Sequence, residues 1–388
     1  MDIPLYEQIY EHVLNEVKEG RLRPGDRVPS EKELADQFGV SRITSKSALE
    51  KLAQSGVVLR IKGKGTYVAE GPDAPDGDSH ESVPANGIPE EAIPGSAAIA
   101  AKRLFGLILP DFSESFGLGL VYAIEERCSE LGMRLLLKRS YGRQDEEESA
   151  IDSFMELGVD GLIIFPVHGE HYNTGLLRLV LNRFPVVLID RYLKGIPACS
   201  VYTDNRQAAQ ELTSHLFQQG HKRIAFMSPP TEHTSTIEDR LNGFMDAYLA
   251  NGLLLNPQYL VTQLRSTLPT SSFNMVHIRA DEDIIREFTQ AHPEVTAFVA
   301  SEYNLALLLW ETLTKMGRRL PDDYSVACFD STPHVFDVPL FTHIAQDENM
   351  IGRTAVDILM SQVEGEEPPL YHTVQFQMVQ GRSIKKFS

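Results

Sequence analysis

Basic side chains that could bind a polyanion gather in one short stretch of this sequence, residues 41–68. The stretch has a single acid, Glu50, and a local net charge of +5, although the whole chain has a net charge of −18. Its six basic residues are Arg42, Lys46, Lys51, Arg60, Lys62 and Lys64. A compact positive patch neutralises phosphates, whereas the acidic remainder of the chain repels them. The stretch therefore indicates a local contact with nucleic acid.

Two short helices are expected to position these side chains. Ser30 and Glu33 have the spacing of a capping box, which predicts a helix that begins at Ser30 and ends at Gly39. Ser41 can cap a second helix almost at once. The residues expected to face inward on the second helix are Ile43, Ala48, Leu49 and Leu52. Those expected near its exposed first turns are Arg42, Thr44, Ser45 and Lys46. This arrangement is typical of a helix-turn-helix, whose second helix enters the DNA major groove.

A β-hairpin is expected directly after the second helix. Residues 57–68 are rich in β-branched residues and are interrupted by Lys62-Gly63-Lys64-Gly65. The glycines let the backbone of this basic tip approach a phosphate closely. Upstream, residues 4–19 have an apolar stripe, which predicts an amphipathic helix that packs on the other two.

These spacings resemble the winged helix of the GntR family of bacterial transcription regulators. The matching residues are Pro4-Leu5-Tyr6, Gly20-x-Leu22-x-Pro24-Gly25-Asp26, Pro29-Ser30-Glu31, Leu34-Ala35, Val40-Ser41-Arg42-x-Thr44, Ala48-Leu49 and Gly63-x-Gly65-Thr66-Tyr67-Val68. The resemblance covers nearly all of residues 1–70 and implies binding to double-stranded operator DNA. The residues implied in that contact are Ser30, Glu31, Ser41, Arg42, Thr44, Ser45, Lys46, Lys62, Gly63, Lys64, Gly65 and Thr66. Lys46 stands where the family usually has Arg; it keeps the charge but loses the bidentate fork that favours a base contact.

Length and composition restrict the class of protein. A chain of 388 residues favours two or three domains. Its hydrophobic content of 42% and charged content of 23% are ordinary for a soluble globular protein. The sequence has no apolar run that could span a membrane and no signal-peptide pattern, so we expect a cytoplasmic protein. The three cysteines, Cys128, Cys199 and Cys328, lack metal or redox spacing and are expected in the core.

Residues 70–102 differ in composition from both of their neighbours. They are rich in Pro, Gly, Asp, Glu and Ser and contain no Lys or Arg before Lys102. Such a segment cannot bury enough apolar surface to fold, which predicts a flexible acidic linker. The predicted domains are therefore a winged helix-turn-helix at 1–69, the linker at 70–102 and an effector-binding domain at 103–388.

The remaining residues alternate short apolar runs with helical stretches. The predicted strands are Leu104–Leu109, Arg134–Lys138, Gly161–Phe165, Val186–Ile189, Ser200–Tyr202, Arg223–Met227, Ala297–Ala300 and Ser325–Phe329. Helices between them include Leu118–Leu131 and Arg206–Gln219. The alternation predicts an α/β fold with parallel sheets that are covered on both faces. Ligands of such sheets bind outside the carboxyl ends of the strands.

This half resembles the effector domain of the LacI family, which has a two-lobed periplasmic-binding-protein-like fold. The matching residues are Leu107-Ile108-Leu109-Pro110-Asp111, Gly158-Val159-Asp160-Gly161, Pro185-Val186-Val187-Leu188-Ile189-Asp190-Arg191, Val201-x-Thr203-Asp204-Asn205, Gly220-His221-Lys222-Arg223-Ile224-Ala225, Arg240-x-x-Gly243-Phe244, Gly317 to Pro321, Phe329-Asp330, Gln346-Asp347 and Ile351-Gly352. The resemblance implies that the chain crosses between the lobes three times. The first lobe would contain 103–190 and about 348–368, and the second about 192–345 and 370–388.

The same resemblance implies an effector site between the lobes. Residues in positions that the family uses for ligand are Asp190, Arg191, Arg240 and Asp330. Carboxylates and bidentate guanidinium groups suit sugar hydroxyls, and aromatic faces suit the C–H side of a sugar ring. An ion pair at the hinge is the alternative role for these four residues. A loop that can touch ligand contributes Asp111, Phe112, Ser115 and Phe116, although Phe116 also suits the core.

The sequence departs from the LacI family after Phe298-Val299-Ala300. The family usually has Asn-Asp at this point, whereas this chain has Ser301-Glu302-Tyr303-Asn304. We expect effector contacts from Ser301, Glu302 and Tyr303, and the longer acid with a tyrosine indicates a different ligand from that of the simplest members. His168 and His171 could bind a polar ligand or a metal, but solvated loop positions are favoured. No metal site and no cofactor is predicted.

The two resemblances together imply a homodimeric repressor of carbohydrate-utilisation genes that a sugar-like effector releases from operator DNA. Co-repression, a non-sugar effector, and a sugar sensor with another output remain alternatives. An enzyme is disfavoured because G-x-S-x-G, H-E-x-x-H and P-loop motifs are absent and no lysine suits a pyridoxal cofactor. A transport protein is disfavoured by the winged helix and the missing signal peptide. No C-terminal leucine heptad is present, which favours a dimer over a tetramer.

Overall fold

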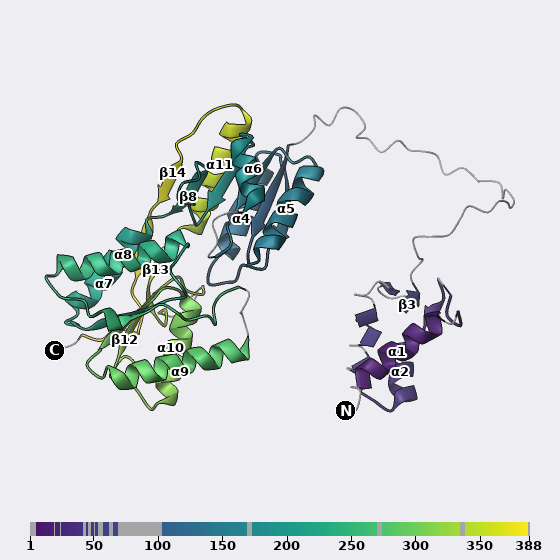
Figure 1. The fold of residues 1–388 in the computed structure, drawn as a ribbon, viewed down its shortest axis with the longest axis horizontal. Helices are drawn as coiled ribbons and strands as arrows, with labels where there is room; N and C mark the ends of the chain where they lie inside the picture. The colour runs from purple at the N-terminus through teal and green to yellow at the C-terminus, as the bar shows by residue number, and fades with distance from the viewer. Residues whose placement is uncertain are drawn as a thin grey trace. The chain divides into compact units, whose positions relative to one another are not determined.

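The structure is a computed structural model and divides into two compact units, residues 1–92 and 93–388 (Figure 1). The residues that it describes are 5–18, 20–23, 25–41, 44–45, 48–49, 51–52, 57–61, 65–68, 103–168, 173–269, 274–333 and 338–386. The predicted linker at 70–102 lies outside these residues, so it stays a prediction.

The first unit combines helices with a small antiparallel sheet. Its elements are α1 (Leu5–Lys18), β1 (Arg27–Val28), α2 (Glu31–Phe38), β2 (Val58–Ile61) and β3 (Gly65–Val68). Residues 44, 45, 48, 49, 51 and 52 are also helical. The sheet has the order β1-β3-β2, and Val58 pairs with Val68 in the hairpin. The described residues thus contain the two helices before residue 40, parts of the second helix of the motif, and both strands of the predicted hairpin.

Local capping explains why α2 begins and ends where the sequence predicts. The Glu33 N–H donates to Ser30 Oγ at 3.3 Å, and the Ser30 N–H donates to the Glu33 carboxylate at 2.7 Å. Gly39 ends the helix in the left-handed conformation, with φ of 64°. The helices then bury one apolar cluster, in which Ile9 and Leu34 meet Leu49 and Leu52.

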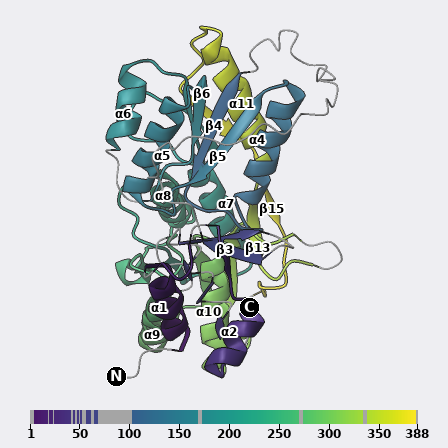
Figure 2. The same cartoon turned by 90° about the vertical axis from the view of Figure 1, so that its right-hand side faces the viewer.

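The first lobe of the second unit is a six-stranded parallel sheet with helices on both faces. The strands, in sheet order, are β14 (Tyr371–Val374), β8 (Cys199–Thr203), β7 (Val186–Ile189), β6 (Gly161–Ile164), β4 (Leu104–Leu109) and β5 (Arg134–Arg139). Its helices are α4 (Leu118–Glu130), α5 (Gln144–Glu156), α6 (Thr174–Leu181) and α11 (Glu348–Val363). Figure 2 shows α4 and α11 on one face of the sheet and α5 and α6 on the other, and each face buries its own apolar cluster.

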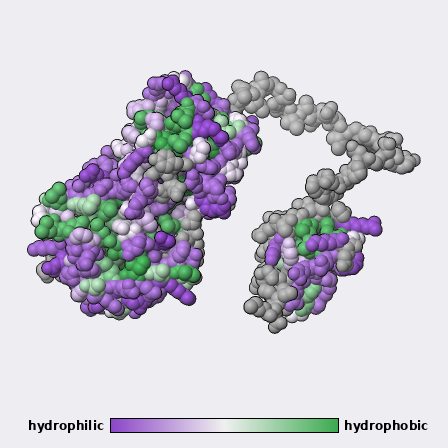
Figure 3. Space-filling view, in the orientation of Figure 1, coloured by the Kyte–Doolittle hydropathy of each residue, from purple (hydrophilic) through white to green (hydrophobic). Residues whose placement is uncertain are grey.

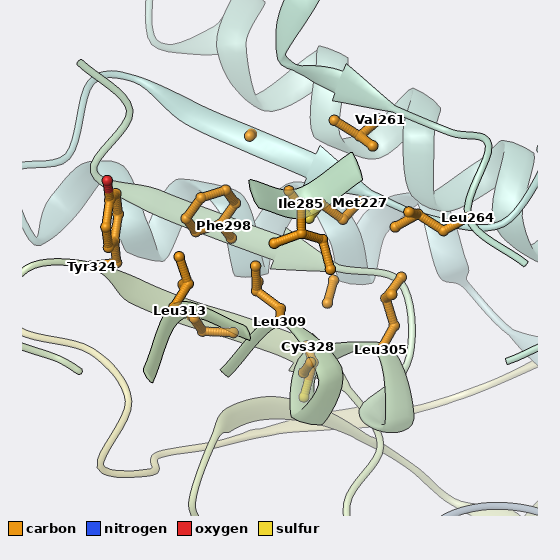
Figure 4. Packing of buried hydrophobic residues seen from close by; sticks show 14 of the residues in the cluster. Met227, Val261, Leu264, Ile285, Phe298, Leu305, Leu309, Leu313, Tyr324 and Cys328 are labelled. Atoms are coloured by element: carbon orange, nitrogen blue, oxygen red, sulfur yellow. The ribbon is translucent and has the colours of Figure 1, made fainter. Parts of the chain in front are cut away.

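The second lobe repeats this architecture, and its strands have the same order as those of the first lobe when they are numbered along the chain. Its strands, in sheet order, are β10 (Leu260–Val261), β9 (Ile224–Met227), β11 (Ala297–Ala300), β12 (Ser325–Phe329), β13 (Thr342–Gln346) and β15 (Phe376–Val379). Only β15 is antiparallel to its neighbour. Its helices are α7 (Asn205–Gln218), α8 (Ser235–Ala250), η1 (Pro257–Tyr259), α9 (Met275–Ala291) and α10 (Tyr303–Lys315). Figure 4 shows the core under α9 and α10, where Phe298 of β11 packs with Leu309 and Leu313.

The chain crosses between the lobes three times, as predicted, but two crossings lie elsewhere than predicted. The sequence assigned residues 192–203 and 370–374 to the second lobe, and this assignment is wrong. Strand β8 pairs with β7 in the first lobe, and β14 pairs with β8. The loop after β7 turns back along the same sheet, so the crossings come after β8, after β13 and after β14.

Candidate ligand-binding cavity

A cavity of about 710 Å³ lies between the two lobes. Its first-lobe wall comes from residues that follow β4, β6 and β7, such as Asp111, Phe165 and Asp190. Its second-lobe wall comes from residues that follow β9, β11 and β12, together with parts of α8, α9 and α10. The cavity is therefore at the carboxyl ends of the parallel strands in both sheets, which is the usual ligand position in open α/β folds.

Ten of the eleven residues predicted to contact an effector line this cavity. They are Asp111, Phe112, Ser115, Phe116, Asp190, Arg191, Arg240, Glu302, Tyr303 and Asp330. Ser301 does not line it: its side chain is fully buried, and its carbonyl oxygen accepts a hydrogen bond from Arg240 at 2.5 Å. The structure brings these ten side chains together around one space, and their contact with an effector stays a prediction.

Asp190 and Asp330 occupy equivalent places in the two lobes. Each follows a fully buried strand, β7 or β12, and each has a positive φ of 64°. The Asp190 N–H donates to Val201 and the Asp330 N–H donates to Ile344, both at 2.9 Å. A left-handed backbone is uncommon for aspartate and persists only where the surroundings hold it. These backbone bonds fix both carboxylates at the edge of the cavity.

Arg191 enters the cavity from the first lobe with part of its hydrogen-bonding capacity unused. Its Nη1 donates to the Pro166 carbonyl oxygen at 2.8 Å, and its guanidinium lies 4.9 Å from the Phe165 ring centroid. Its buried Nε is 3.5 Å from the Asp190 carboxylate, outside hydrogen-bond geometry, and has no partner among the described residues. Burial lowers the pKa of Arg191, and Asp190 opposes this effect. A buried donor without an acceptor costs about 1–3 kcal/mol, so a ligand acceptor would relieve it.

Arg240 enters from α8 of the second lobe and is held on several sides. Its Nε donates to Asn205 Oδ1 at 2.7 Å, and its Nη1 donates to the Ser301 carbonyl oxygen. The guanidinium also lies 3.9 Å from the Phe329 ring centroid, and the residue is 5% exposed. Three protein groups thus fix its plane, which leaves its free edge at the cavity as a preformed donor.

Burial changes the protonation of the carboxylates around the cavity. Gln346 Nε2 donates to both carboxylate oxygens of Asp330, at 3.0 and 3.2 Å. Burial nevertheless raises the pKa of Asp330 to about 7, with Arg240 and the Gln346 contacts opposing it. Burial also raises the pKa of Asp190 and of Glu302, whose carboxylate accepts a hydrogen bond from Thr267. Protonation of these carboxylates would leave the positive charges of Arg191 and Arg240 less compensated.

The loop after β4 is fastened at both ends. The Asp111 carboxylate pairs with Arg139 at 2.9 Å and accepts the Phe112 N–H at 2.8 Å. At its other end, Gly117 donates to the Glu348 carboxylate at 2.7 Å. Phe116 meets the edge of the Phe165 ring at 6.2 Å between centroids. Phe116 thus both packs on its neighbour and lines the cavity, so the two roles left open for it are compatible.

Some residues that line the cavity were not among the predicted effector contacts. His168 was predicted at a solvated position, but it lines the cavity and its buried Nε2 has no partner among the described residues. Burial lowers its pKa to about 4, which leaves the imidazole neutral near pH 7. Residues 266–269 also line the cavity, and their loop follows β10, whose two residues are too few to predict as a strand. His171 lies outside the described residues.

The first unit contains some of the residues predicted to contact DNA. The Thr44 N–H donates to Ser41 Oγ at 3.2 Å, and Ser41 is exposed, so Ser41 caps the second helix as predicted. Ser30 and Thr44 are half-buried. Predicted contacts outside the described residues are Arg42, Lys46, Lys62, Gly63 and Lys64, and the Glu31 side chain is likewise not described. For Gly65 the structure gives the backbone, which begins β3.

Two of the predicted DNA contacts are buried. Ser45 is fully buried, because it shares the inward stripe of its helix with Ala48, Leu49 and Leu52 at helical spacing. Thr66 is 7% exposed, because it lies in β3, the central strand of the sheet. The prediction that Ser45 lies on an exposed first turn is wrong, and neither side chain is open to a DNA backbone.

The described part of the chain gives no sign of a metal centre or a membrane span. Among these residues, no group of three or more His, Cys, Asp or Glu side chains is arranged to hold a metal ion. Within the same ranges, no helix is both long enough and apolar enough to cross a membrane.

The fold and the cavity define a two-lobed ligand-binding domain, and comparisons with known proteins identify its family. Residues 102–377 match the family of periplasmic binding proteins and sugar binding domain of LacI family, and residues 5–68 match the bacterial regulatory proteins of the gntR family. The chain therefore belongs to the LacI-type sugar-binding-domain family and carries a GntR-type DNA-binding domain.

Two curated relatives match this chain over nearly its whole length. An arabinose metabolism transcriptional repressor of Geobacillus stearothermophilus is 28% identical over 369 residues, which are 93% of this chain and 92% of the relative. A protein of the same description from Halalkalibacterium halodurans is 24% identical over 93% of this chain and 90% of its own. The crystal structure of the regulator CcpA of Lactococcus lactis matches 73% of this chain and all of its own, with 20% identity and a TM-score of 0.64. This chain is a ligand-responsive, DNA-binding transcriptional regulator.

Proposed function

We propose that this chain represses carbohydrate-utilisation genes and leaves its operator when a sugar binds between the lobes. The observation that carries the proposal is the convergence of Asp190, Arg191, Arg240 and Asp330 on one cavity. Two carboxylates and two guanidinium groups on opposite sides of a space suit a ligand with many hydroxyl groups. The names of the relatives, repressors of arabinose metabolism, support a carbohydrate as the effector.

Operator recognition is assigned to the winged helix. The sequence predicts Arg42, Thr44 and Lys46 at the start of the second helix, which would enter the major groove. It predicts Lys62 and Lys64 at the tip of the hairpin, where they would contact the phosphate backbone. Such a local positive patch on a chain with a net charge of −18 would make binding depend on salt concentration.

Contacts between the lobes offer a route from the cavity to the rest of the second unit. Asp330 accepts a hydrogen bond from Gln346, which directly precedes the segment where the chain passes from the second lobe into α11 of the first. Two residues later, Glu348 accepts the N–H groups of Gly117 and Leu120 at the start of α4. An effector that engages Asp330 would thus act on a crossing segment that also holds α4. We assign the change in operator affinity to this connection, because it joins both lobes.

A homodimer is part of the proposal. Tyr122 on α4 is 60% exposed and Leu137 on β5 is 42% exposed. Figure 3 shows green apolar patches among the hydrophilic surface of this unit. Contiguous apolar patches on a surface often mark contacts between proteins, and we assign Tyr122 and Leu137 to such a contact. Two winged helices in one dimer would read the two halves of a palindromic operator.

We also propose that the chain acts in the cytoplasm and catalyses no reaction. Operator DNA is in the cytoplasm of a bacterium, and the relatives are described as regulators of transcription. A regulator of this kind needs its cavity only to bind and release a ligand.

Retardation of a labelled DNA fragment tests this function. The full-length protein should retard DNA from upstream of sugar-utilisation genes near its own gene, and one sugar of a panel should abolish the retardation. Protein that binds no such fragment would refute the assignment as an operator-binding regulator. Protein that binds DNA but ignores every sugar would refute the carbohydrate effector.

Replacing Arg42 by Ala tests the recognition helix separately. If Arg42 reads a base, the substitution should weaken operator binding by about 1–3 kcal/mol. Ser45→Ala is the matched control on the same helix, because Ser45 is buried and should not touch DNA. Fluorescence anisotropy of labelled operator measures both variants. Wild-type affinity in Arg42→Ala would show that the recognition helix is assigned wrongly.

A further inference from the structure

The cavity extends beyond its polar centre along α10. Residues of this helix that line it run from Tyr303, beside the sheet edge, through Leu307 to Glu311. Eight residues of helix span about 12 Å, at about 1.5 Å for each residue. That distance is longer than one sugar ring and comparable with two linked rings. The cavity therefore has an outer part, away from Asp190 and Asp330.

The helix that bounds this outer part is fixed in the core. Leu305, Leu309 and Leu313 on its opposite face are fully buried in the apolar cluster of the second lobe. Figure 4 shows them directed toward Phe298 and Ile285. A helix held along its whole length in this way cannot turn its cavity-facing residues elsewhere. Leu307 and Glu311 are thus part of a fixed wall.

Residues 266–269 of the loop after β10 also line the cavity, and this loop is fixed as well. Leu264 is fully buried in the same cluster. The Asp281 carboxylate, which is 2% exposed, accepts the N–H groups of Arg265 at 2.9 Å and of Ser266 at 2.7 Å. Ser266 is 7% exposed, lines the cavity, and its Oγ has no hydrogen-bond partner among the described residues. A buried hydroxyl without a partner is a cost that a ligand hydroxyl would remove.

The chemistry of the outer part differs from that of the centre. Leu268, Ile278 and Leu307 give it apolar contact area, while Glu311 brings a carboxylate that is ion-paired with Lys315 at 3.0 Å. Among the described residues that line the whole cavity, the arginines are Arg191 and Arg240, and both belong to the centre. Apolar side chains suit the C–H face of a ring, and carboxylates accept from its hydroxyls. A phosphate or acid group here would meet the Glu311 carboxylate and no arginine of the described residues that line the cavity.

We propose that this cavity takes a neutral two-ring glycoside, such as a disaccharide. One ring would lie among the arginines and aspartates, and the second would lie against Leu268, Ile278 and Leu307 near Ser266. The inference rests on the proposed function, since it names the class of carbohydrate for the same cavity. A monosaccharide would leave the outer part, and Ser266 with it, without contacts.

Isothermal titration of the full-length protein tests the proposal with pairs of sugars. The pairs are glucose with maltose and with cellobiose, galactose with lactose, xylose with xylobiose, and arabinose with arabinobiose. We expect one disaccharide to bind at least about tenfold more tightly than its monosaccharide. Leu307→Asp should lower the affinity for that disaccharide by about tenfold and change that for the monosaccharide by less than about twofold. Leu249→Asp is the matched control, because Leu249 is 79% exposed on α8 and is not part of the cavity.

The outcomes separate this inference from the proposed function. A monosaccharide that binds as tightly as its disaccharides overturns the two-ring ligand but keeps a carbohydrate effector. If Leu307→Asp lowers the affinity for both sugars equally, or changes neither affinity, the outer site is overturned in the same way. Binding of none of the sugars overturns the carbohydrate effector itself and the two-ring ligand with it.

Discussion

Two buried arginines, Arg191 and Arg240, face the same cavity from opposite lobes, and the protein satisfies them to different degrees. Arg240 has acceptors for Nε and Nη1, and its guanidinium stacks on Phe329. Arg191 has an acceptor for Nη1, while its Nε is buried without a partner among the described residues. Arg240 is thus held by two hydrogen bonds and keeps a free edge for a ligand, whereas Arg191 has a buried Nε without a hydrogen-bond partner in the described part of the chain.

The adjacent aspartates also differ in hydrogen bonding, with more contacts in the second lobe than in the first. Asp330, in the second lobe, accepts two contacts from Gln346. Asp190, in the first lobe, is paired with Arg191 at 3.5 Å, outside hydrogen-bond geometry. Preorganised groups lower the cost of binding, whereas groups left incomplete gain most from a ligand. We infer that the second lobe fixes the orientation of the ligand. The polar groups of the first lobe would complete their hydrogen bonds only when a ligand is bound.

Removing Arg240 should have the largest effect. Replacing Arg240 by Leu leaves Asp330, Asp190 and Glu302 without their closest shared cation, so we expect the free energy of unfolding to fall by about 3–5 kcal/mol. Urea unfolding can be followed by the fluorescence of Trp310, the one tryptophan of the chain, which packs on Phe341.

Arg206→Leu is the control for this substitution. Arg206 pairs with Asp246 at 2.6 Å across α7 and α8, but its side chain is 59% exposed. An exposed ion pair contributes about 0–1 kcal/mol, so Arg206→Leu should change the stability little. Equal losses in the two variants would contradict the structural role given to Arg240.

Removing the acceptor of Arg240 Nε should leave this nitrogen without a hydrogen-bond partner, as Arg191 Nε is among the described residues. Asn205 is 1% exposed, and Asn205→Ala would leave Arg240 Nε buried without a partner. We expect the free energy of unfolding to fall by about 1–3 kcal/mol, measured by the same urea titration. Asn205→Asp keeps an acceptor in place and should retain more of the stability. An Ala variant as stable as the wild type would show that Arg240 does not depend on this contact.

Arg191→Lys should separate binding from stability. Lysine can keep one donor near Pro166 but loses the planar fork, so we expect the affinity for the effector to fall by about tenfold. The free energy of unfolding should change by less than about 1 kcal/mol, because an incomplete contact is replaced. Isothermal titration and urea unfolding measure the two quantities. A large loss of stability with unchanged affinity would reverse the roles of the two arginines.

The affinity for the effector should depend on pH through the ionisation of Asp330. Burial raises the pKa of Asp330 to about 7, and we expect its ionised form to accept the ligand hydroxyls. The affinity for the effector should therefore rise by about eightfold between pH 6 and pH 7.5, as Asp330 ionises. Asp330→Asn should flatten this change. A wild-type affinity that falls over the same range would contradict the role of ionised Asp330.

The free energy of unfolding should change with pH in the direction opposite to the affinity for the effector. The folded pKa of Asp330 lies above its ordinary value of 3.8, so the folded state binds more protons between those two pH values. The free energy of unfolding should fall as pH rises through this range. Glu147 adds to the same slope, because burial raises its pKa to about 7 as well. Asp330→Asn should therefore reduce the slope of stability against pH without removing it.

The sequence predicted most of the fold because its signals are local. The capping box at Ser30 and Glu33 forms as expected, and strands such as Leu104–Leu109 and Ala297–Ala300 have the predicted bounds. Continuous apolar runs identify strands that are buried on both faces. The interior strand β13 and the edge strands β10, β14 and β15 were not predicted, because they lack such runs. The lobe boundaries were wrong for the same reason, since β8 and β14 lie beside each other only in the folded sheet.

The site was predictable only where resemblance or a strand end marked it. Asp190 and Asp330 each follow a strong apolar strand, and both line the cavity. Ser266 depends on a hydrogen bond to Asp281, fifteen residues away, which no local pattern reveals. Ser45 was misjudged because a small polar residue on an apolar stripe reads as exposed until its neighbours are known. Chemistry near strand ends is thus visible in sequence, and support from distant loops is not.

The central claim is that a ligand between the lobes, held in part by Arg191, controls operator binding. The most direct measurement is fluorescence anisotropy of labelled operator DNA bound to wild type and to Arg191→Lys, titrated with the effector. We predict that the effector releases DNA from both proteins and that the variant needs about tenfold more of it for half-release. Equal half-release concentrations for the two proteins would contradict the claim, because the effector would then act without Arg191.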